Sequence, residues 1–145
     1  MNKFKCIIFD LDGTLIDSGP ILFKIYKQFL EKYGHIGTKK EFKLLDGPKL
    51  NQIIHYLKNK YNLKPSVLKL KKDYDNEITK KYQTKIPINK GVVDILNFLQ
   101  LNGYTIGLAT SNSKKNTDSV LMKNELFNYF SFFVYGDDVK ISKPN

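Results

Sequence analysis

A short strand near the start of the chain is the feature that most restricts the fold. Residues 4–10 read FKCIIFD, and the apolar side chains of Cys6 through Phe9 are consecutive rather than alternating. A strand that is apolar on both faces is typical of a parallel sheet covered by helices on both sides. The strand runs directly into a polar turn, LDGT, at residues 11–14. The pattern therefore predicts an α/β protein in which this first strand is buried.

Two further apolar segments repeat this arrangement later in the chain. Residues 104–109 and 132–135 are predicted strands, and each is followed by a polar turn. One predicted helix begins at Val92 and stops at Asn102-Gly103, and another spans about residues 114–124. An alternation of strand, helix, strand, helix and strand predicts a parallel sheet.

The long stretch between the first and second strands is helical throughout. Residues 18–86 contain no strand candidate, and their apolar residues recur at helical spacing. Four helices are predicted there, beginning near Pro20, Thr38, Pro48 and Pro65. Glu41 follows Thr38 by three residues, which predicts a capping box at the second of these helices.

The composition excludes several classes of protein. Hydrophobic residues make up 41% and aromatic residues 13% of the 145 residues, which favours a packed core over disorder. No segment approaches the roughly 18 apolar residues that a membrane span needs, and the start of the chain does not resemble a signal peptide. Cys6 is the single cysteine and is predicted to be a buried thiol. We therefore expect a cytoplasmic protein without a membrane partner.

The positive charge is concentrated in the helical stretch. The chain carries a net charge of +10. Residues 18–88 hold 16 lysines and six acidic residues, whereas the charges of the remainder balance. These lysines could attract phosphate anions, or they could simply form a solvated surface. The sequence contains no arginine, the side chain best suited to bind guanine and phosphate in a bidentate manner, so no nucleic-acid partner is expected.

Two carboxylates at the end of the first strand carry the strongest chemical signal. Asp10 ends the strand, and Asp12 follows in the turn with Gly13. Open α/β sheets bind their ligands at this edge. Such a pair can hold a hard cation, while one carboxylate attacks and the other exchanges protons. An ordinary Asp-Gly turn after a strand is the alternative from these residues alone.

Three segments resemble motifs of the haloacid dehalogenase superfamily. FDLDGTLIDS at residues 9–18 resembles motif I, YTIGLATSN at residues 104–112 resembles motif II, and Lys143-Pro144 resembles motif III. The helical insertion is similar to the cap found in the branch of phosphoglycolate phosphatase and β-phosphoglucomutase. The resemblance implies a Rossmann-like core of residues 1–17 and 88–145, with a helical cap at residues 18–87.

The resemblance also implies an activity and a role for individual residues. It implies a Mg²⁺-dependent hydrolase that cleaves a small phosphorylated metabolite through an aspartyl-phosphate. Asp10 would be the nucleophile and Asp12 the general acid and base. The phosphate would be bound by Thr110, Ser111 and Lys143. Mg²⁺ would be held by the Asp10 carboxylate and the Asp12 backbone carbonyl.

The chain departs from the family pattern at its end. The acidic pair of motif IV should follow Lys143, but the sequence stops at Asn145. We therefore expect a C-terminally truncated core whose first strand is a bare edge, in the family's strand order 3-2-1-4-5. Gly136-Asp137-Asp138 is interpreted as a turn at the end of a strand rather than as a metal site.

Two other functions stay open from the sequence. One is a phosphomutase of the β-phosphoglucomutase type, although no arginine lies near residues 47–50, where that branch uses one in its cap. The other is a truncated, non-catalytic module that binds phosphate or a partner through the sheet edge. The sequence leaves the identity of the metabolite and the oligomeric state open.

Overall fold

The computed structural model describes residues 5–45 and 47–139, and Lys143 and Pro144 therefore lie outside the described residues. Contacts divide the described chain into two compact units. The sheet unit contains the described residues up to Gly19 and those from Tyr82 onward, and the helical unit is Pro20–Lys81. No helix in the described ranges is long and apolar enough to cross a membrane.

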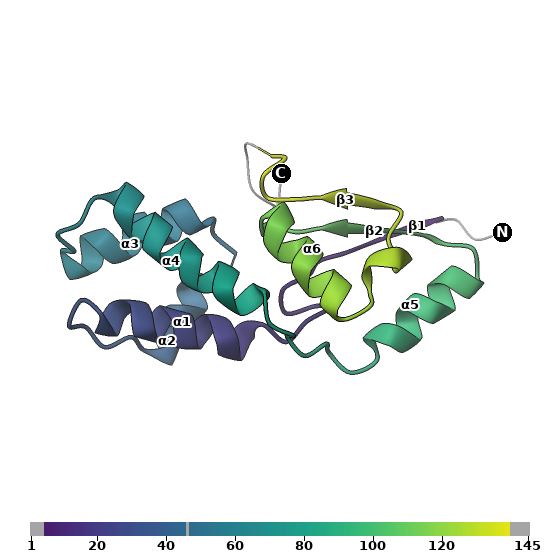
Figure 1. Cartoon of the computed structure of the whole chain (residues 1–145), viewed down its shortest axis with the longest axis horizontal. Helices are drawn as coiled ribbons and strands as arrows, with labels where there is room; N and C mark the ends of the chain where they lie inside the picture. The colour runs from purple at the N-terminus through teal and green to yellow at the C-terminus, as the bar shows by residue number, and fades with distance from the viewer. Residues whose placement is uncertain (1–4, 46, 140–145) are drawn as a thin grey trace. The chain divides into compact units, whose positions relative to one another are not determined.

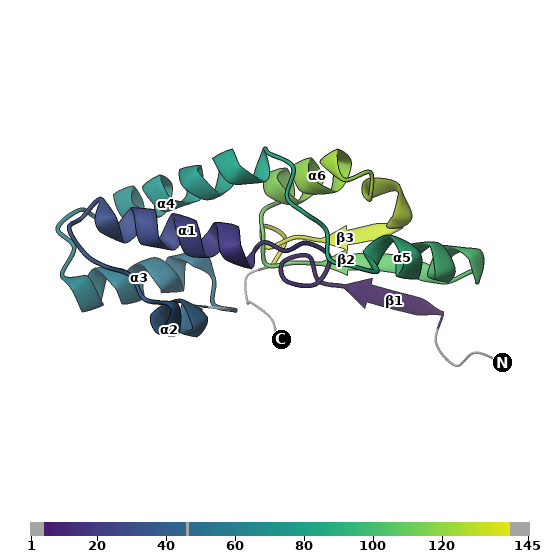
Figure 2. The ribbon, with the colours of Figure 1, turned by 90° about the horizontal axis from the view of Figure 1, so that it is seen from below.

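The sheet of the described residues has three parallel strands. They are β1 (Cys6–Phe9), β2 (Thr105–Ala109) and β3 (Phe132–Val134), and β2 lies in the centre (Figure 1). In the register, Ile8 is opposite Gly107, which in turn is opposite Phe132. Figure 2 shows β1 at the outer side of the sheet. Each strand falls within its predicted segment, and the predicted α/β class with a parallel sheet is confirmed.

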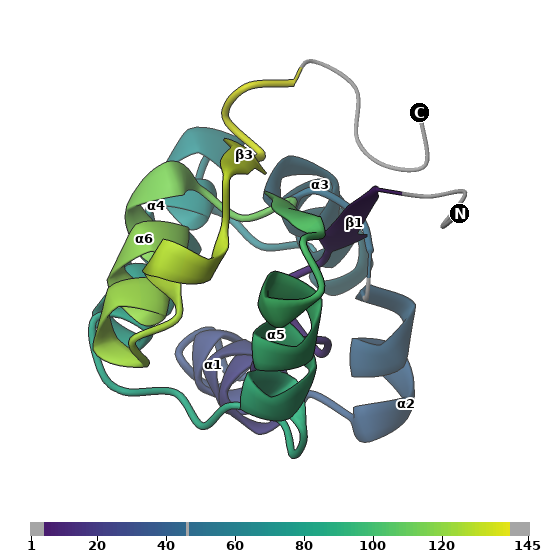
Figure 3. The same cartoon turned by 90° about the vertical axis from the view of Figure 1, so that its right-hand side faces the viewer.

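The two α-helices that the structure describes in the sheet unit lie on the same side of the sheet. Figure 3 shows α5 (Val92–Leu101) and α6 (Lys114–Lys123) on that side, and a short 3₁₀ turn, Phe127–Tyr129, precedes β3. The chain moves from β1 to β2 to β3 in one direction along the sheet, and right-handed crossovers then place both connections on one face. The core between the helices and the strands includes Leu96, Leu99, Ile106, Leu108, Val120 and Leu121.

The opposite face of the sheet is open to solvent in the part of the chain that the structure describes. Ile8, Phe132 and Val134 are 58%, 36% and 38% exposed. Cys6 is exposed as well. The prediction that β1 is buried on both faces, with Cys6 in the core, is therefore wrong for these residues. The cause is the topology, because both described crossover helices cover the other face.

In the described residues the helical unit is built from four α-helices, of which the first begins and the last ends one residue inside the sheet unit. They are α1 (Gly19–Glu31), α2 (Lys39–Phe42), α3 (Leu50–Tyr61) and α4 (Val67–Tyr82), and one 3₁₀ turn, Lys43–Leu45, follows α2. The described part of residues 18–86 has no strand, as predicted. The core of this unit is formed mainly by Ile25, Tyr26, Phe29, Leu30, Ile54, Leu57, Leu70 and Tyr74.

Candidate active site

Asp10 and Asp12 lie immediately after the C-terminal end of β1. Both are half-buried, and the Leu11 backbone N–H donates to Asp10 Oδ1 at 2.8 Å. The next residues form a tight turn in which the Leu11 carbonyl accepts from the N–H groups of Leu15 at 2.9 Å and Ile16 at 3.1 Å. The chain reverses at Gly13, where φ is +74°. This local folding places both carboxylates at the edge of the sheet where ligands of α/β proteins bind.

The turn is fixed by buried side chains and by a neighbouring segment. Leu11, Leu15 and Ile16 are at most 1% exposed and anchor the turn in the core. The Asn89 backbone N–H donates to the Leu15 carbonyl at 2.9 Å, and its side-chain amide donates to the Thr14 carbonyl at 2.8 Å. The backbone around the two carboxylates is therefore held from several sides.

Asp12 accepts a hydrogen bond on each of its carboxylate oxygens. The Tyr82 hydroxyl donates to Oδ1, and the Asn112 side-chain amide donates to Oδ2 at 3.1 Å. Burial, and then the charge of Asp12, raise the pKa of the Tyr82 phenol above its ordinary value, so the hydroxyl remains a donor. Sequence reasoning missed both contacts, because they join residues that are 70 and 100 positions apart in the sequence.

Asn112 is itself held by four backbone or side-chain contacts. Its Oδ1 accepts from the Ser113 N–H at 2.9 Å and from the Asn116 amide at 3.2 Å. Its own N–H donates to Thr110 Oγ1 at 3.1 Å, and its carbonyl accepts from the Gly136 N–H at 2.8 Å. The loop between β2 and α6 therefore presents Asn112 to Asp12 in a fixed orientation.

The structure describes two of the three predicted phosphate-binding residues. Thr110 directly follows β2, is 5% exposed, and its N–H donates to the Val134 carbonyl at 2.9 Å. Because β1 and β2 are adjacent and parallel, Thr110 lies at the same sheet edge as Asp10. Ser111 follows it and is exposed. Lys143 lies outside the described residues. The roles of all three in phosphate binding stay predictions.

The oxygen donors of Asp10 and Asp12 fit a hard cation. Mg²⁺ is commonly bound through one or two protein carboxylates while it keeps several waters. Both side-chain oxygens of Asp12 already accept hydrogen bonds. The Asp10 carboxylate and the Asp12 main-chain carbonyl, the groups predicted to hold Mg²⁺, supply oxygen ligands of this kind. Within residues 5–45 and 47–139, no group of three or more His, Cys, Asp or Glu gathers around a common point.

The segment after β3 forms a turn, as predicted. Asp138 Oδ2 accepts from the Tyr135 N–H at 2.8 Å, and Asp137 Oδ2 accepts from the Lys114 N–H at 2.9 Å. Tyr135 is fixed further by its hydroxyl, which donates to Asp118 Oδ1 at 2.8 Å. Asp137 and Asp138 thus order the turn and its junction with α6.

Replacing Gly136 by alanine is expected to disturb the loop that carries Asn112. A Cβ atom at Gly136 would lie 2.1 Å from the Ser111 carbonyl oxygen, so one backbone segment has to move. Overpacking of this kind costs about 1–3 kcal/mol in free energy of unfolding, which urea unfolding would measure. Gly19→Ala is the control, because a Cβ there meets nothing within 4 Å. Equal stability of the two variants would contradict the close approach.

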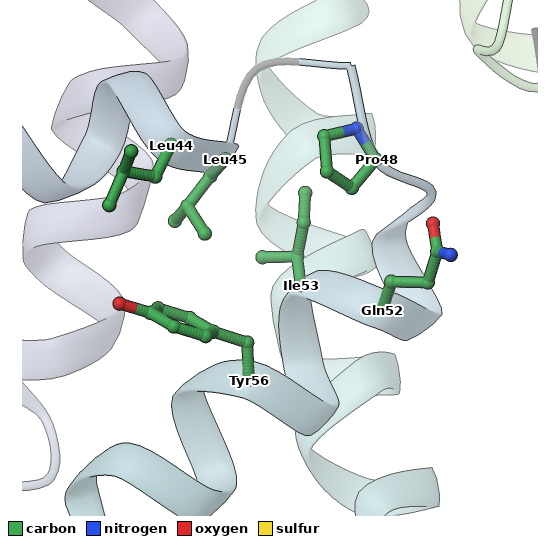
Figure 4. Close-up of a pocket in the computed structure, with 6 residues that line it drawn as sticks. All are labelled: Leu44, Leu45, Pro48, Gln52, Ile53 and Tyr56. Atoms are coloured by element: carbon green, nitrogen blue, oxygen red, sulfur yellow. The ribbon is translucent and has the colours of Figure 1, made fainter. Parts of the chain in front are cut away.

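The helical unit has a separate hollow of about 250 Å³ (Figure 4). Leu45, Ile53 and Tyr56 turn their side chains into this hollow, and Gln52 stands at its border. Leu44 and Pro48 complete the lining. None of these six residues is charged, so the lining offers apolar contacts, one amide and the Tyr56 hydroxyl.

Comparison with known proteins identifies the family. The sequence pattern of the family described as haloacid dehalogenase-like hydrolase matches residues 7–145. The chain belongs to the haloacid dehalogenase-like hydrolase family. The predicted motif I, residues 9–18, therefore lies within the part of the chain that matches the family, residues 7–145. Asp10 and Asp12 occupy the first strand end of a haloacid dehalogenase-like fold.

The relatives of this haloacid dehalogenase-like chain include two kinds of phosphatase. It is 29% identical to a phosphorylated carbohydrates phosphatase of Thermotoga maritima, over 97% of the chain and 65% of the relative. It is 27% identical to the pyrophosphatase PpaX of Bacillus cereus, over 99% of the chain and 64% of the relative. The chain thus spans slightly less than two thirds of the length of these relatives.

A solved structure has the same fold. It is described as a predicted phosphoglycolate phosphatase from Haemophilus somnus and is 20% identical to the chain, with a TM-score of 0.85. The match covers all of this chain and 68% of the solved one. The haloacid dehalogenase-like fold, with its Rossmann-like parallel sheet, is therefore present.

Proposed function

We propose that the protein is a Mg²⁺-dependent phosphohydrolase that cleaves small phosphorylated metabolites through an aspartyl-phosphate, an acyl phosphate formed on Asp10. The observation that carries this proposal is the placement of Asp10, Asp12 and Thr110 at one edge of the sheet. The family and the names of its phosphatase relatives support the same chemistry. The name of the Thermotoga maritima relative favours a phosphorylated carbohydrate as the substrate.

In the first half of the reaction, Asp10 acts as the nucleophile. One of its carboxylate oxygens attacks the phosphorus in line, and the bond between phosphorus and the ester oxygen breaks. Asp12 gives a proton to that leaving oxygen, so the product departs as an alcohol. The Thr110 hydroxyl donates to a phosphoryl oxygen, and Ser111 and Lys143 supply further donors and positive charge.

In the second half, water releases the phosphate. Asp12 is now ionised and takes a proton from the water, whose oxygen attacks the phosphorus of the aspartyl-phosphate. The bond between phosphorus and the Asp10 oxygen breaks, so inorganic phosphate leaves and the Asp10 carboxylate is restored. The Asp10 carboxylate and the Asp12 carbonyl would hold Mg²⁺, which would supply positive charge that stabilises the transition state.

The direct test is release of phosphate by the complete protein, with p-nitrophenyl phosphate as the probe. We expect turnover with Mg²⁺, and a fall of at least about 10²-fold after removal of the metal by EDTA, because a bound cation stabilises the transition state by several kcal/mol. Excess Mg²⁺ should restore the rate. Activity that is unchanged by EDTA would contradict the metal dependence.

The same assay separates the other two functions. A phosphomutase would need a bisphosphate activator and would isomerise a sugar phosphate rather than release phosphate. A non-catalytic module would bind phosphate without turnover and without a requirement for Mg²⁺. Either result would exclude the proposed hydrolase function and support the corresponding alternative.

A further inference from the structure

Two side chains from separate parts of the sheet unit converge on Asp12. Tyr82 is the last residue of α4, and Asn112 lies in the loop between β2 and α6. They are separated from Asp12 by 70 and 100 residues in sequence. Each donates to a different oxygen of the same carboxylate. The carboxylate is thereby fixed in its rotation as well as in its position.

Tyr82 is built into the core with its hydroxyl facing this carboxylate. Its side chain is fully buried, and its carbonyl accepts from the Ser119 hydroxyl at 3.0 Å. The Asn112 amide, which donates to the other Asp12 oxygen, lies at the same carboxylate. The phenol therefore has little freedom to turn away from Asp12.

We propose that Tyr82 is a positioning residue, which holds the Asp12 carboxyl group in the orientation that delivers a proton to the leaving oxygen. The inference rests on the proposed phosphohydrolase function. A general acid has to lie within hydrogen-bond reach of the atom that it protonates, and a small misplacement lowers the rate. Tyr82 keeps its own proton, and the transferred proton passes from Asp12 to the ester oxygen as the phosphorus–oxygen bond breaks.

This role predicts an effect that depends on the leaving group. An alkyl alcohol leaves slowly unless its oxygen is protonated, whereas 2,4-dinitrophenolate is stable without a proton. The ratio kcat/KM reports the steps up to departure of the leaving group, so it isolates proton delivery by Asp12 from the later hydrolysis. A positioning defect should therefore appear in kcat/KM for an alkyl phosphate and not for 2,4-dinitrophenyl phosphate.

The test compares Tyr82→Phe with the wild type in the complete protein. We expect kcat/KM for glycerol phosphate to fall about tenfold, the effect of losing one hydrogen bond to a charged group. The value for 2,4-dinitrophenyl phosphate should change less than about twofold. Tyr74→Phe is the matched control, since Tyr74 is a buried tyrosine packed against Phe29 in the helical unit. For Tyr74→Phe, the ratio of kcat/KM for glycerol phosphate to kcat/KM for 2,4-dinitrophenyl phosphate should equal that of the wild type.

The outcomes are distinguishable. Partial unfolding of Tyr82→Phe lowers both values by the same factor, so their ratio is independent of the active fraction. Equal losses with both substrates would overturn the positioning role alone. Absence of any Mg²⁺-dependent turnover in the wild type would overturn the proposed function and this inference with it.

A second measurement needs no Tyr82 variant. The hydroxyl proton of Tyr82, assigned by NMR with labelled tyrosine, should exchange slowly with water and should shift in Asp12→Asn. A rapidly exchanging hydroxyl proton would contradict the contact even if Tyr82→Phe does not fold.

Discussion

Asp10→Asn is expected to abolish phosphate release, with a loss of at least about 10³-fold in kcat, as for other enzymes that lose their nucleophile. The carboxamide has nearly the shape of the carboxylate, and its oxygen can still accept from the Leu11 N–H, which donates to Asp10 Oδ1 at 2.8 Å. The amide oxygen is a poor nucleophile and cannot form the aspartyl-phosphate. The variant should therefore fold and bind but not turn over. Released phosphate, measured with p-nitrophenyl phosphate and Mg²⁺, is the assay.

Asp17→Asn is the control for the Asp10 variant. Asp17 is an exposed carboxylate in the same segment, and its backbone N–H, which the substitution keeps, donates to the Pro87 carbonyl at 2.9 Å. We expect its activity to match the wild type. After acid quenching, mass spectrometry should find a phosphoryl group on the wild type and on Asp17→Asn but not on Asp10→Asn. Normal turnover of Asp10→Asn would exclude the proposed mechanism.

The strands and helices could be predicted because their signals are local. The apolar segments at 104–109 and 132–135 contain β2 and β3, and the helix predicted after Pro65 is α4. The exposed face of the sheet could not be predicted in this way. Consecutive apolar residues in β1 indicate that both faces can be buried, but the order of the strands and the hand of the crossovers decide which face the helices cover.

The candidate site was predictable to the extent that it follows strand ends. Asp10, Asp12 and Thr110 come directly after β1 or β2, so parallel pairing alone brings them to one edge. Tyr82 and Asn112 gave no comparable signal. Their contacts with Asp12 join residues that are 70 and 100 positions apart, and such contacts follow from the packing of the whole unit.

Glu41 shows how a correct local signal can have a second, non-local outcome. Thr38 Oγ1 accepts from the Glu41 N–H at 3.2 Å, so the predicted cap of α2 is formed. The Glu41 carboxylate does not complete a capping box but turns into the helical unit. It accepts from the hydroxyls of Tyr26 and, at 2.5 Å, of Tyr61, and it pairs with Lys60 at 2.7 Å.

This buried carboxylate predicts a measurable contribution of charge to the stability of the helical unit. Glu41 is 4% exposed, and Tyr26 is fully buried. Glu41→Gln keeps the size of the side chain. It removes the negative charge that accepts from the two tyrosine hydroxyls and pairs with the Lys60 ammonium group. We expect the free energy of unfolding at pH 7 to fall by about 2 kcal/mol, the value of a buried hydrogen bond to a charged group. Urea unfolding followed by circular dichroism measures it.

The pH dependence of the free energy of unfolding tests directly whether the Glu41 charge stabilises the helical unit. Burial by itself works to raise the pKa of Glu41, but hydrogen bonds from Lys60, Tyr26 and Tyr61 outweigh it, so the pKa lies below the ordinary value. The folded pKa is thus lower than the unfolded pKa of about 4.3. The stabilisation is therefore present above about pH 4.3 and is lost as the pH falls through the folded pKa.

The difference in free energy of unfolding between the wild type and Glu41→Gln should accordingly reach its maximum at pH 7 and decrease in acid. Glu31→Gln makes the same chemical change at an exposed residue at the end of α1, and we expect it to leave the free energy of unfolding within about 0.5 kcal/mol of the wild type. A Glu41→Gln difference that stays constant from pH 7 into acid would show that the lost stability comes from shape rather than charge. Because Tyr26, Tyr61 and Lys60 come from α1 and α3, loss of this charge should loosen the contacts of α2 with both helices.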